Sequence, residues 1–169
     1  MYRIGIGYDV HAFDLQNITN SYITLCGIQI PYKNKLIAHS DGDVALHALT
    51  DAMLGSVAEG SIGTHFPPTD EKWKNTNSEK FIRHANSLIN NKGYKIQNLD
   101  ITIICQEPKI MPHAMKMREN ISSILNLEID QVNIKAVTTE GLGALGRQEG
   151  IAAQAVVLVQ KSISQNTGA

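Results

Sequence analysis

In the stretch Ile4-Gly5-Ile6-Gly7-Tyr8-Asp9-Val10-His11, large apolar residues alternate with glycine or polar residues, a pattern typical of a β-strand. Successive side chains of a strand point to opposite faces, so Asp9 and His11 project from the same face. Val10 projects from the other face, which we expect to be the core. A carboxylate and an imidazole in this arrangement supply half of a metal site, and a third ligand has to come from another element.

The best third ligand is His47, in the stretch from His39 to Asp51. This stretch predicts a helix that begins after Asp41 or Asp43, either of which can cap it. Its apolar stripe consists of Leu46, Leu49, Met53, Leu54 and Val57. Asp51 lies one turn after His47 on the same face and is placed to accept a hydrogen bond from the second imidazole nitrogen. The pattern is loose, and a surface aspartate with a buried histidine is the plain alternative.

Composition limits the classes of function. The chain has 169 residues, 43% hydrophobic and 18% charged, as expected for one domain with a substantial core. Its formal net charge is -1 without long runs of like charge, so we expect neither a nucleic-acid nor a membrane partner. No membrane span and no signal or transit pattern is found, which indicates a cytoplasmic protein. Cys26 and Cys105 are expected to be buried, reduced thiols.

The rest of the sequence predicts mixed strands and helices. Turn signals place a hairpin at Cys26-Gly27, and residues 76–79 match a capping box that starts a second helix, ended by Gly93. Further predicted elements are a helix at 113–125 and strands at 99–106, 130–137 and 151–160. The last strand is almost continuously apolar, so we expect it to be buried on both faces.

This pattern indicates an α+β fold, a single domain with a small mixed β-sheet and helices packed on one face. The other face then needs a cover, and oligomerisation is the simplest source. We place the domain at residues 1–161 and a polar C-terminal tail at residues 162–169.

Two turns near the C-terminal strand, one glycine-rich and one polar, match patterns found in ligand-binding sites. Residues 141–146, GLGALG, match the dinucleotide-binding fingerprint by letter, but a strand rather than a helix follows, so we interpret the glycines as turn formers. Just before them, Val137-Thr138-Thr139-Glu140 gathers hydroxyls and a carboxylate where a strand ends. Thr138 could donate to a phosphate and Glu140 could hold Mg²⁺. The plain alternative is that Thr138 is present because threonine favours strands and that Glu140 is a solvated loop residue.

Taken together, five segments resemble the 2-C-methyl-D-erythritol 2,4-cyclodiphosphate synthase family. They are residues 7–13, GYDVHAF; 39–51, HSDGDVALHALTD; 66–70, FPPTD; 106–109, QEPK; and 138–140, TTE. The resemblance covers nearly the whole chain in order. It implies a phosphorus–oxygen lyase of the non-mevalonate isoprenoid pathway that assembles as a homotrimer, with active sites between subunits. The reaction converts 4-diphosphocytidyl-2-C-methyl-D-erythritol 2-phosphate to 2-C-methyl-D-erythritol 2,4-cyclodiphosphate, as the 2-phosphate attacks the β-phosphorus and CMP leaves.

The resemblance also implies a role for individual residues. Asp9, His11 and His47 match ligands of Zn²⁺ or a similar divalent metal, and Glu140 matches the residue that holds Mg²⁺ or Mn²⁺ bridging the diphosphate. His39 and Thr138 match catalytic residues that stabilise the transition state. The positions implied to contact substrate are Asp9, Val10, His11, His39, Ser40, Ser61, Ile62, Gly63, Phe66, Pro67, Pro68, Thr69, Asp70, Cys105, Gln106, Glu107, Pro108, Lys109, Ile110, Met111, Val137, Thr138, Thr139, Glu140, Ala144 and Arg147.

Other functions stay open at this point. A trimeric ligand-binding protein with structural zinc, or a zinc phosphohydrolase, could share the fold and the ligands. Three protein ligands with an open fourth position favour catalysis, and a fourth protein ligand would favour a structural metal. The implied partners are a small cytidine diphosphate substrate, further copies of the chain and the upstream cytidylyltransferase, which is sometimes fused to this domain.

Overall fold

The computed structural model describes residues 1–67, 69–73 and 76–162. Pro68 and all of the predicted tail after Ser162 lie outside the described residues. The order of the helices and strands is β1 (Tyr2–Leu25), β2 (Ile28–Leu36), α1 (Val44–Ser56), α2 (Ile62–His65), η1 (Glu71–Trp73), α3 (Glu79–Asn91), β3 (Tyr94–Ile104), η2 (Met111–His113), α4 (Ala114–Leu125), η3 (Ile129–Gln131), β4 (Val132–Val137), α5 (Gly143–Gly146) and β5 (Gly150–Lys161).

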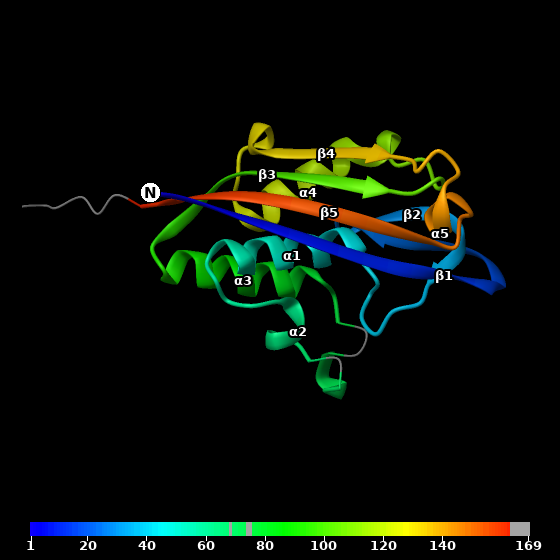
Figure 1. The fold of residues 1–169 in the computed structure, drawn as a ribbon, viewed down its shortest axis with the longest axis horizontal. Coiled ribbons are helices and arrows are strands. Elements are labelled where there is room, and N and C mark those ends of the chain that lie inside the picture. Colours follow the sequence, from blue (N-terminus) through cyan, green and yellow to red (C-terminus); the bar gives the residue numbers. More distant parts are fainter. Residues whose placement is uncertain (68, 74–75, 163–169) are drawn as a thin grey trace, which may run out of the picture.

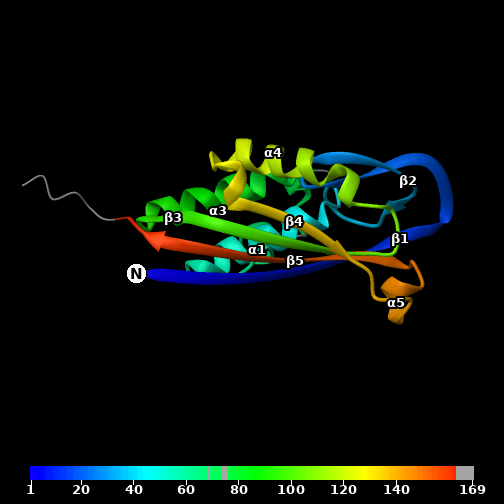
Figure 2. The same cartoon turned by 90° about the horizontal axis from the view of Figure 1, so that it is seen from above.

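The strands form one sheet in the order β2-β1-β5-β3-β4. Strands β2, β1, β5 and β3 pair antiparallel in succession, whereas β3 and β4 are parallel. Figures 1 and 2 show α1, α3 and α4 on the same face of this sheet. The predicted α+β fold, with a mixed sheet and helices on one face, is therefore confirmed. Among the described residues, no helix is long and apolar enough to cross a membrane.

Asp43 fixes where helix α1 begins. Its carboxylate accepts a hydrogen bond from the Leu46 backbone N–H at 3.0 Å, so Asp43, rather than Asp41, is the cap. The same carboxylate accepts N–H groups of Cys26 and Gly27 in the β1–β2 turn, at 2.9 and 2.7 Å. Complete burial raises the pKa of Asp43 to about 6, against the opposing effect of these hydrogen bonds. One buried side chain thus joins the hairpin turn to the start of α1.

Helix α1 lies against β1 at two glycines. A Cβ atom at Gly7 would lie 2.0 Å from the Ala48 carbonyl oxygen, and one at Gly5 would lie 1.8 Å from the Ala52 carbonyl oxygen. Backbone atoms of a packed helix cannot give way as the end of a flexible side chain can, so only glycine permits this spacing. The close approach brings the first turn of α1, with His47, onto the face of β1 that carries the metal-ligand pattern.

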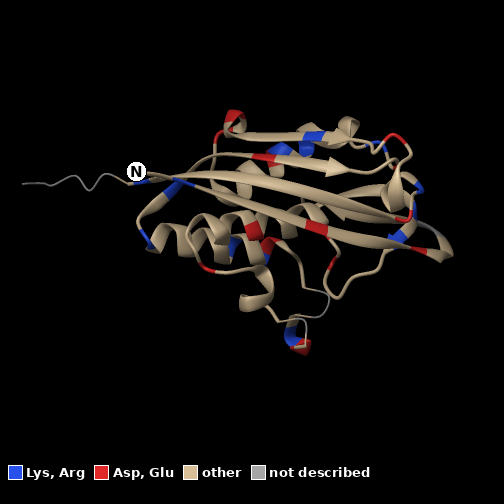
Figure 3. Ribbon diagram, viewed as in Figure 1, with Lys and Arg blue, Asp and Glu red and all other residues tan. Residues whose placement is uncertain are grey.

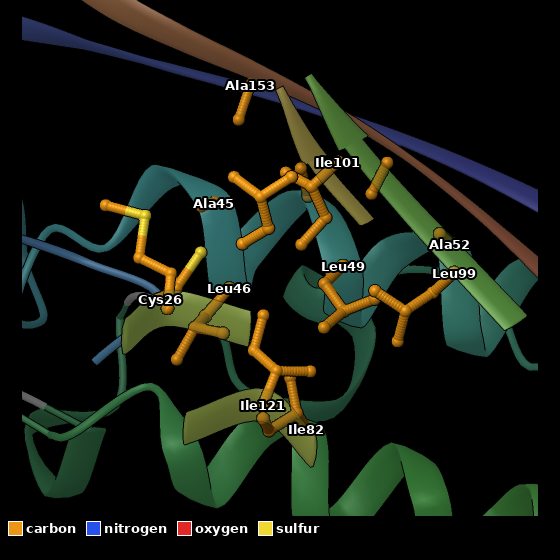
Figure 4. Packing of buried hydrophobic residues seen from close by; sticks show 14 of the residues in the cluster. Cys26, Ala45, Leu46, Leu49, Ala52, Ile82, Leu99, Ile101, Ile121 and Ala153 are labelled. Atoms are coloured by element: carbon orange, nitrogen blue, oxygen red, sulfur yellow. The ribbon is translucent and has the colours of Figure 1, made fainter. Parts of the chain in front are cut away.

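The core fills the space between the sheet and the helices. Leu46 and Leu49 of α1 are fully buried, and Figure 4 shows them among Ile82 of α3, Ile121 of α4 and Ile101 of β3. Helix α1 is buried on nearly all sides, because β1 and β5 cover one side of it and α3 another. This central position makes α1 a rigid support for the residues at its N-terminus.

The other face of the sheet is uncovered in the single chain. The exposed large hydrophobic side chains of β1 and β5 on this face are Tyr2, Ile4, Ile6, Tyr8, Val10 and Val156. The expectation that Val10 points into the core is wrong: it is 49% exposed. The expectation that β5 is buried on both faces is wrong at Gln154 and Val156, which are exposed. Figure 3 shows few charged residues along β1 and β5, so this face is an apolar surface that favours association.

The contact between β1 and α1 predicts that an alanine at Gly7 strongly lowers the free energy of unfolding, whereas an alanine at Gly55 changes it little. Gly7→Ala should lower the free energy of unfolding by at least about 3 kcal/mol, because the added methyl group meets helix backbone. Gly55→Ala is the matched control, since its Cβ would approach only the Ile6 carbonyl oxygen, at 3.9 Å. It should raise stability by up to about 0.5–1 kcal/mol through helix propensity. Urea denaturation measures both, and wild-type stability in Gly7→Ala would contradict the packing argument.

Candidate functional site

Three potential metal ligands converge where β1 meets α1. Asp9 and His11 project from the helix-facing side of β1, and His47 from the first turn of α1. The Asp9 Oδ2 atom lies 3.0 Å from His11 Nε2 and 2.9 Å from His47 Nδ1. The two imidazole nitrogens are 3.2 Å apart. One carboxylate oxygen and two nitrogens therefore face a common point.

The electrostatics of this group favour a bound cation. Burial acts to raise the pKa of the Asp9 carboxyl, but hydrogen bonds and charge from His11 and His47 outweigh it and hold that pKa well below its usual range. Burial acts to lower the pKa of His47, but the adjacent Asp9 carboxylate outweighs this and raises it. A metal ion would compete with protons for the same three ligands, so its affinity should fall with falling pH.

The donor set fits a divalent metal such as zinc. Nitrogen and carboxylate oxygen are both common zinc ligands, and three protein ligands leave one position open to water or substrate. Within residues 1–67, 69–73 and 76–162, no fourth aspartate, glutamate, histidine or cysteine joins this group. The arrangement is that of an open site rather than a closed structural one.

The second nitrogen of His47 has partners that the sequence did not predict. His47 Nε2 lies 3.0 Å from Ser40 Oγ and 2.9 Å from Ser78 Oγ. Asp51, expected to be this partner, instead accepts the Ile62 backbone N–H at 2.6 Å and so holds the start of α2. The capping-box prediction is also wrong, because the Thr76 hydroxyl donates to Lys72 at 3.4 Å and the Ser78 side chain makes no cap hydrogen bond.

A cavity of about 210 Å³ lies beside the three ligands. Its lining consists of His11, His39, Ser40, His47, Ile62, Gly63, Phe66, Trp73 and Phe81. Phe66 packs against Trp73 and Phe81, with ring centroids 4.8 and 4.5 Å apart. Trp73 had no predicted role, since an isolated tryptophan in a loop carries no pattern. The cavity thus combines the metal ligands with an aromatic wall.

Several predicted contacts surround this cavity without lining it. Ser61 is exposed at the N-terminus of α2, where its hydroxyl lies 3.5 Å from Thr64 Oγ1. Asp70 forms an ion pair with Lys72 at 2.6 Å. Pro67 is half-buried and Thr69 is exposed in the same loop.

A second cavity, of about 370 Å³, lies where β3 and β4 end. Its lining consists of Cys105, Gln106, Pro108, Lys109, Ile110, Met111, Pro112, Ala136, Val137 and Thr138. Glu107 lies beside it, and its carboxylate forms an ion pair with Lys109 at 3.0 Å. The structure therefore gathers residues 105–111 with 137–138, as the resemblance implies.

Beyond this cavity the chain turns sharply at Glu140. Thr138 Oγ1 donates to Glu140 Oε1 and accepts from the Glu140 backbone N–H, both at 3.2 Å. Glu140 has a φ of 53°, a region that side chains other than glycine adopt at an energetic cost and often near functional sites. Thr139 bonds the Leu142 carbonyl oxygen at 2.7 Å. The Glu140 side chain is exposed.

The glycine-rich run that follows forms turns and one short helix. Gly141 and Gly143 have φ values of 80° and 67°. Helix α5 has only four residues and leads into β5, so the context of a dinucleotide-binding loop is absent, as predicted. Ala144 lies exposed on α5, and Arg147, just after it, forms an ion pair with Glu149 at 2.6 Å.

The two cavities are separate in one chain. His11 pairs with Ile151 of β5, and the adjacent Ala152 pairs with Ile104 of β3. Ile104 in turn pairs with Val137 of β4. The metal-ligand group and the Thr138–Glu140 turn are therefore three strand spacings apart, about 14 Å. The predicted site residues therefore form two groups in one chain.

Comparisons with known proteins agree with this arrangement. Residues 2–160 match the profile of the YgbB family. A protein of Ehrlichia chaffeensis named 2-C-methyl-D-erythritol 2,4-cyclodiphosphate synthase is 58% identical over 160 residues, covering 94% of this chain and 92% of its own. A protein of the same name from Pseudoalteromonas atlantica is 55% identical over 162 residues, covering 96% and 98%.

Solved structures show the same fold. IspF of Plasmodium falciparum in complex with CDP has a TM-score of 0.84 at 36% identity and covers 96% of this chain and 97% of its own. The bifunctional IspDF of Campylobacter jejuni has a TM-score of 0.89 at 40% identity; 95% of this chain matches 42% of that longer one. The chain therefore belongs to the YgbB family, together with relatives named 2-C-methyl-D-erythritol 2,4-cyclodiphosphate synthase.

Proposed function

We infer that this chain is a lyase that converts 4-diphosphocytidyl-2-C-methyl-D-erythritol 2-phosphate to 2-C-methyl-D-erythritol 2,4-cyclodiphosphate and CMP. The 2-phosphate forms a bond to the β-phosphorus, and the bond from that phosphorus to the CMP phosphate breaks. This is a step in the non-mevalonate route to isoprenoid precursors. The family match supports the reaction, and the observation that carries it is the open group of Asp9, His11 and His47 beside a cavity.

The reaction needs two anionic phosphates to be held in line while a third phosphate group leaves with CMP, so positioning and electrostatics supply most of the catalysis. We propose zinc at Asp9, His11 and His47, where it would polarise the β-phosphate. We propose Mg²⁺ or Mn²⁺ at Glu140, on the diphosphate. His39, at the metal-side cavity, and Thr138, at the second cavity, donate hydrogen bonds to oxygens on which charge develops.

Substrate binding divides between the two cavities. In this proposal the methylerythritol phosphate contacts Ser40 and the Phe66 wall, and the cytidine enters the second cavity, where Lys109 meets its phosphates. The other positions assigned to substrate are Val10, Ser61, Ile62, Gly63, Pro67, Pro68, Thr69, Asp70, Cys105, Gln106, Glu107, Pro108, Ile110, Met111, Val137, Thr139, Ala144 and Arg147. The name of the CDP complex of the Plasmodium falciparum relative supports a cytidine diphosphate ligand.

A complete site then needs two copies of the chain. The metal-side cavity of one copy faces the second cavity of its neighbour in a homotrimer. The uncovered apolar face of β1 and β5 supports this proposal, because association would bury it. Val10 lies on that face and Asp9 and His11 on the opposite one, so the same strand serves assembly and catalysis.

Three further assignments belong to this proposal. The catalytic domain extends over residues 1–161. The upstream cytidylyltransferase is a partner, which the bifunctional Campylobacter jejuni protein supports. The location is the cytoplasm.

Removing the metal tests the function. The protein should release CMP from the diphosphocytidyl substrate with Zn²⁺ and Mg²⁺, lose at least about 100-fold of that rate after chelation, and regain it with zinc. Its assembly and circular dichroism spectrum should stay unchanged on chelation, as expected for a catalytic metal. His47→Ala should resemble the chelated protein and not respond to zinc.

Two results would contradict this account. Loss of the folded assembly on chelation would identify a structural metal in a ligand-binding protein. A linear product with water incorporated would identify a phosphohydrolase.

The uncovered face predicts the assembly state. Ile6→Glu places a charge on a side chain that is 62% exposed in the single chain but buried in the proposed trimer, and should yield monomers in light scattering. Ile129→Glu is the control, since Ile129 is 39% exposed on η3, away from this face, and should leave the trimer intact. A wild-type protein that elutes as a monomer would refute the proposed assembly.

A further inference from the structure

A buried hydroxyl behind His47 links it to a carboxylate. Ser78 at the start of α3 is completely buried, and its Oγ lies 2.9 Å from His47 Nε2 and 2.5 Å from Asp41 Oδ1. The Ser78 backbone N–H donates to the other oxygen, Asp41 Oδ2, at 2.8 Å. Asp41 therefore accepts hydrogen bonds from both donors of Ser78, and that serine contacts the metal-ligand histidine.

The chemistry of the three groups fixes the direction of these hydrogen bonds. A carboxylate only accepts, so the Ser78 hydroxyl proton points to Asp41. The lone pairs of Ser78 Oγ are then left to accept a hydrogen bond from the His47 Nε2–H group. In the metal-free chain the Asp9 carboxylate, 2.9 Å away, accepts a hydrogen bond from His47 Nδ1. A bound metal would replace that Nδ1 proton, and the neutral imidazole would then carry its one N–H on Nε2, where Ser78 Oγ accepts it. This is the tautomer that a metal at Nδ1 requires.

We propose that Ser78 and Asp41 are positioning residues that select the metal-binding tautomer and ring orientation of His47. Partners of this kind commonly orient histidine ligands and affect metal affinity by about 10–100-fold when removed. The inference rests on the proposed metal function of Asp9, His11 and His47. It adds two residues, separated in sequence, that lie outside both the group of three ligands and the lining of the metal-side cavity.

The start of α3 holds His47 from more than one side. Phe81, one turn after Ser78, packs on the His47 ring with centroids 5.9 Å apart. The Asp41 backbone N–H also donates to the Thr76 carbonyl oxygen at 3.3 Å. The loop before α1 is thereby joined to the loop before α3, and the ring of His47 is held between them.

Ser40 contacts the same nitrogen but differs in its surroundings. Its hydroxyl lies 3.0 Å from His47 Nε2, yet it lines the metal-side cavity and is only half-buried. Within the described part of the chain, no carboxylate forms a hydrogen bond with the Ser40 hydroxyl. Ser40 is therefore available to a ligand, whereas Ser78 has its proton committed to Asp41.

The test measures metal affinity rather than catalysis. Ser78→Ala should raise the zinc dissociation constant about 10–100-fold, determined at one pH by competition with a chromophoric chelator. Ser87→Ala is the matched control: it is the same substitution on the exposed side of α3, where Ser87 donates to the His84 carbonyl oxygen, and it should leave the constant unchanged. In the zinc-loaded protein, the His47 Nε2–H signal in ¹H–¹⁵N NMR should be protected from exchange in wild type and exchange rapidly in Ser78→Ala.

A second variant keeps the proposal testable if Ser78→Ala does not fold. Asp41→Asn lets an amide N–H donate to Ser78 Oγ, which turns the hydroxyl proton toward His47 Nε2 and favours the wrong tautomer. It should weaken zinc binding at least as much as Ser78→Ala. Wild-type affinity and a protected signal in either folded variant would overturn the inference and leave the proposed function standing. Failure of the wild-type protein itself to bind zinc would instead refute the proposed metal function.

Discussion

The contact between α1 and the glycines of β1 is the constraint on which the site depends. Because Gly5 and Gly7 lack a Cβ atom, the helix backbone lies directly on the strand, and His47 reaches ligands that β1 presents. Any side chain at Gly7 would push the helix away and separate the ligands. Asp43 fixes the rotation and start of α1 through the hairpin turn. Fold stability and the geometry of the three candidate metal ligands therefore depend on one packing contact.

In the proposed trimer, strand β1 would couple catalysis to assembly through its two faces. Its helix-facing side carries Asp9 and His11, and its open side carries an apolar row that includes Ile6 and Val10. The metal-ligand group and the Thr138–Glu140 turn lie too far apart in one chain to form a single compact site. In the proposed trimer, a neighbouring copy on the open face would bring a metal-side cavity and a second cavity together. In that proposal the open face is part of the mechanism.

Periodicity predicted much of the fold, and long-range contacts account for what it missed. Alternation in β1 placed Asp9 and His11 on one face. It does not show which face of the sheet the helices cover, so the prediction that Val10 points into the core was wrong. The helical spacing that identified His47 also suggested Asp51 as its partner. The actual partners are Ser40 and Ser78, and the buried one, Ser78, lies 31 residues away in sequence and can be found only in three dimensions. The function followed from resemblance to a family, since composition indicated only an α+β domain.

The most direct measurement mixes two inactive variants. Neither His47→Ala nor Glu140→Gln should release CMP at an appreciable rate alone. If each site takes its metal side from one copy and its Glu140 side from the next, hybrids reassembled from equal amounts should regain about a quarter of wild-type activity. No recovery in verified hybrids would place the whole site within one chain and contradict this account.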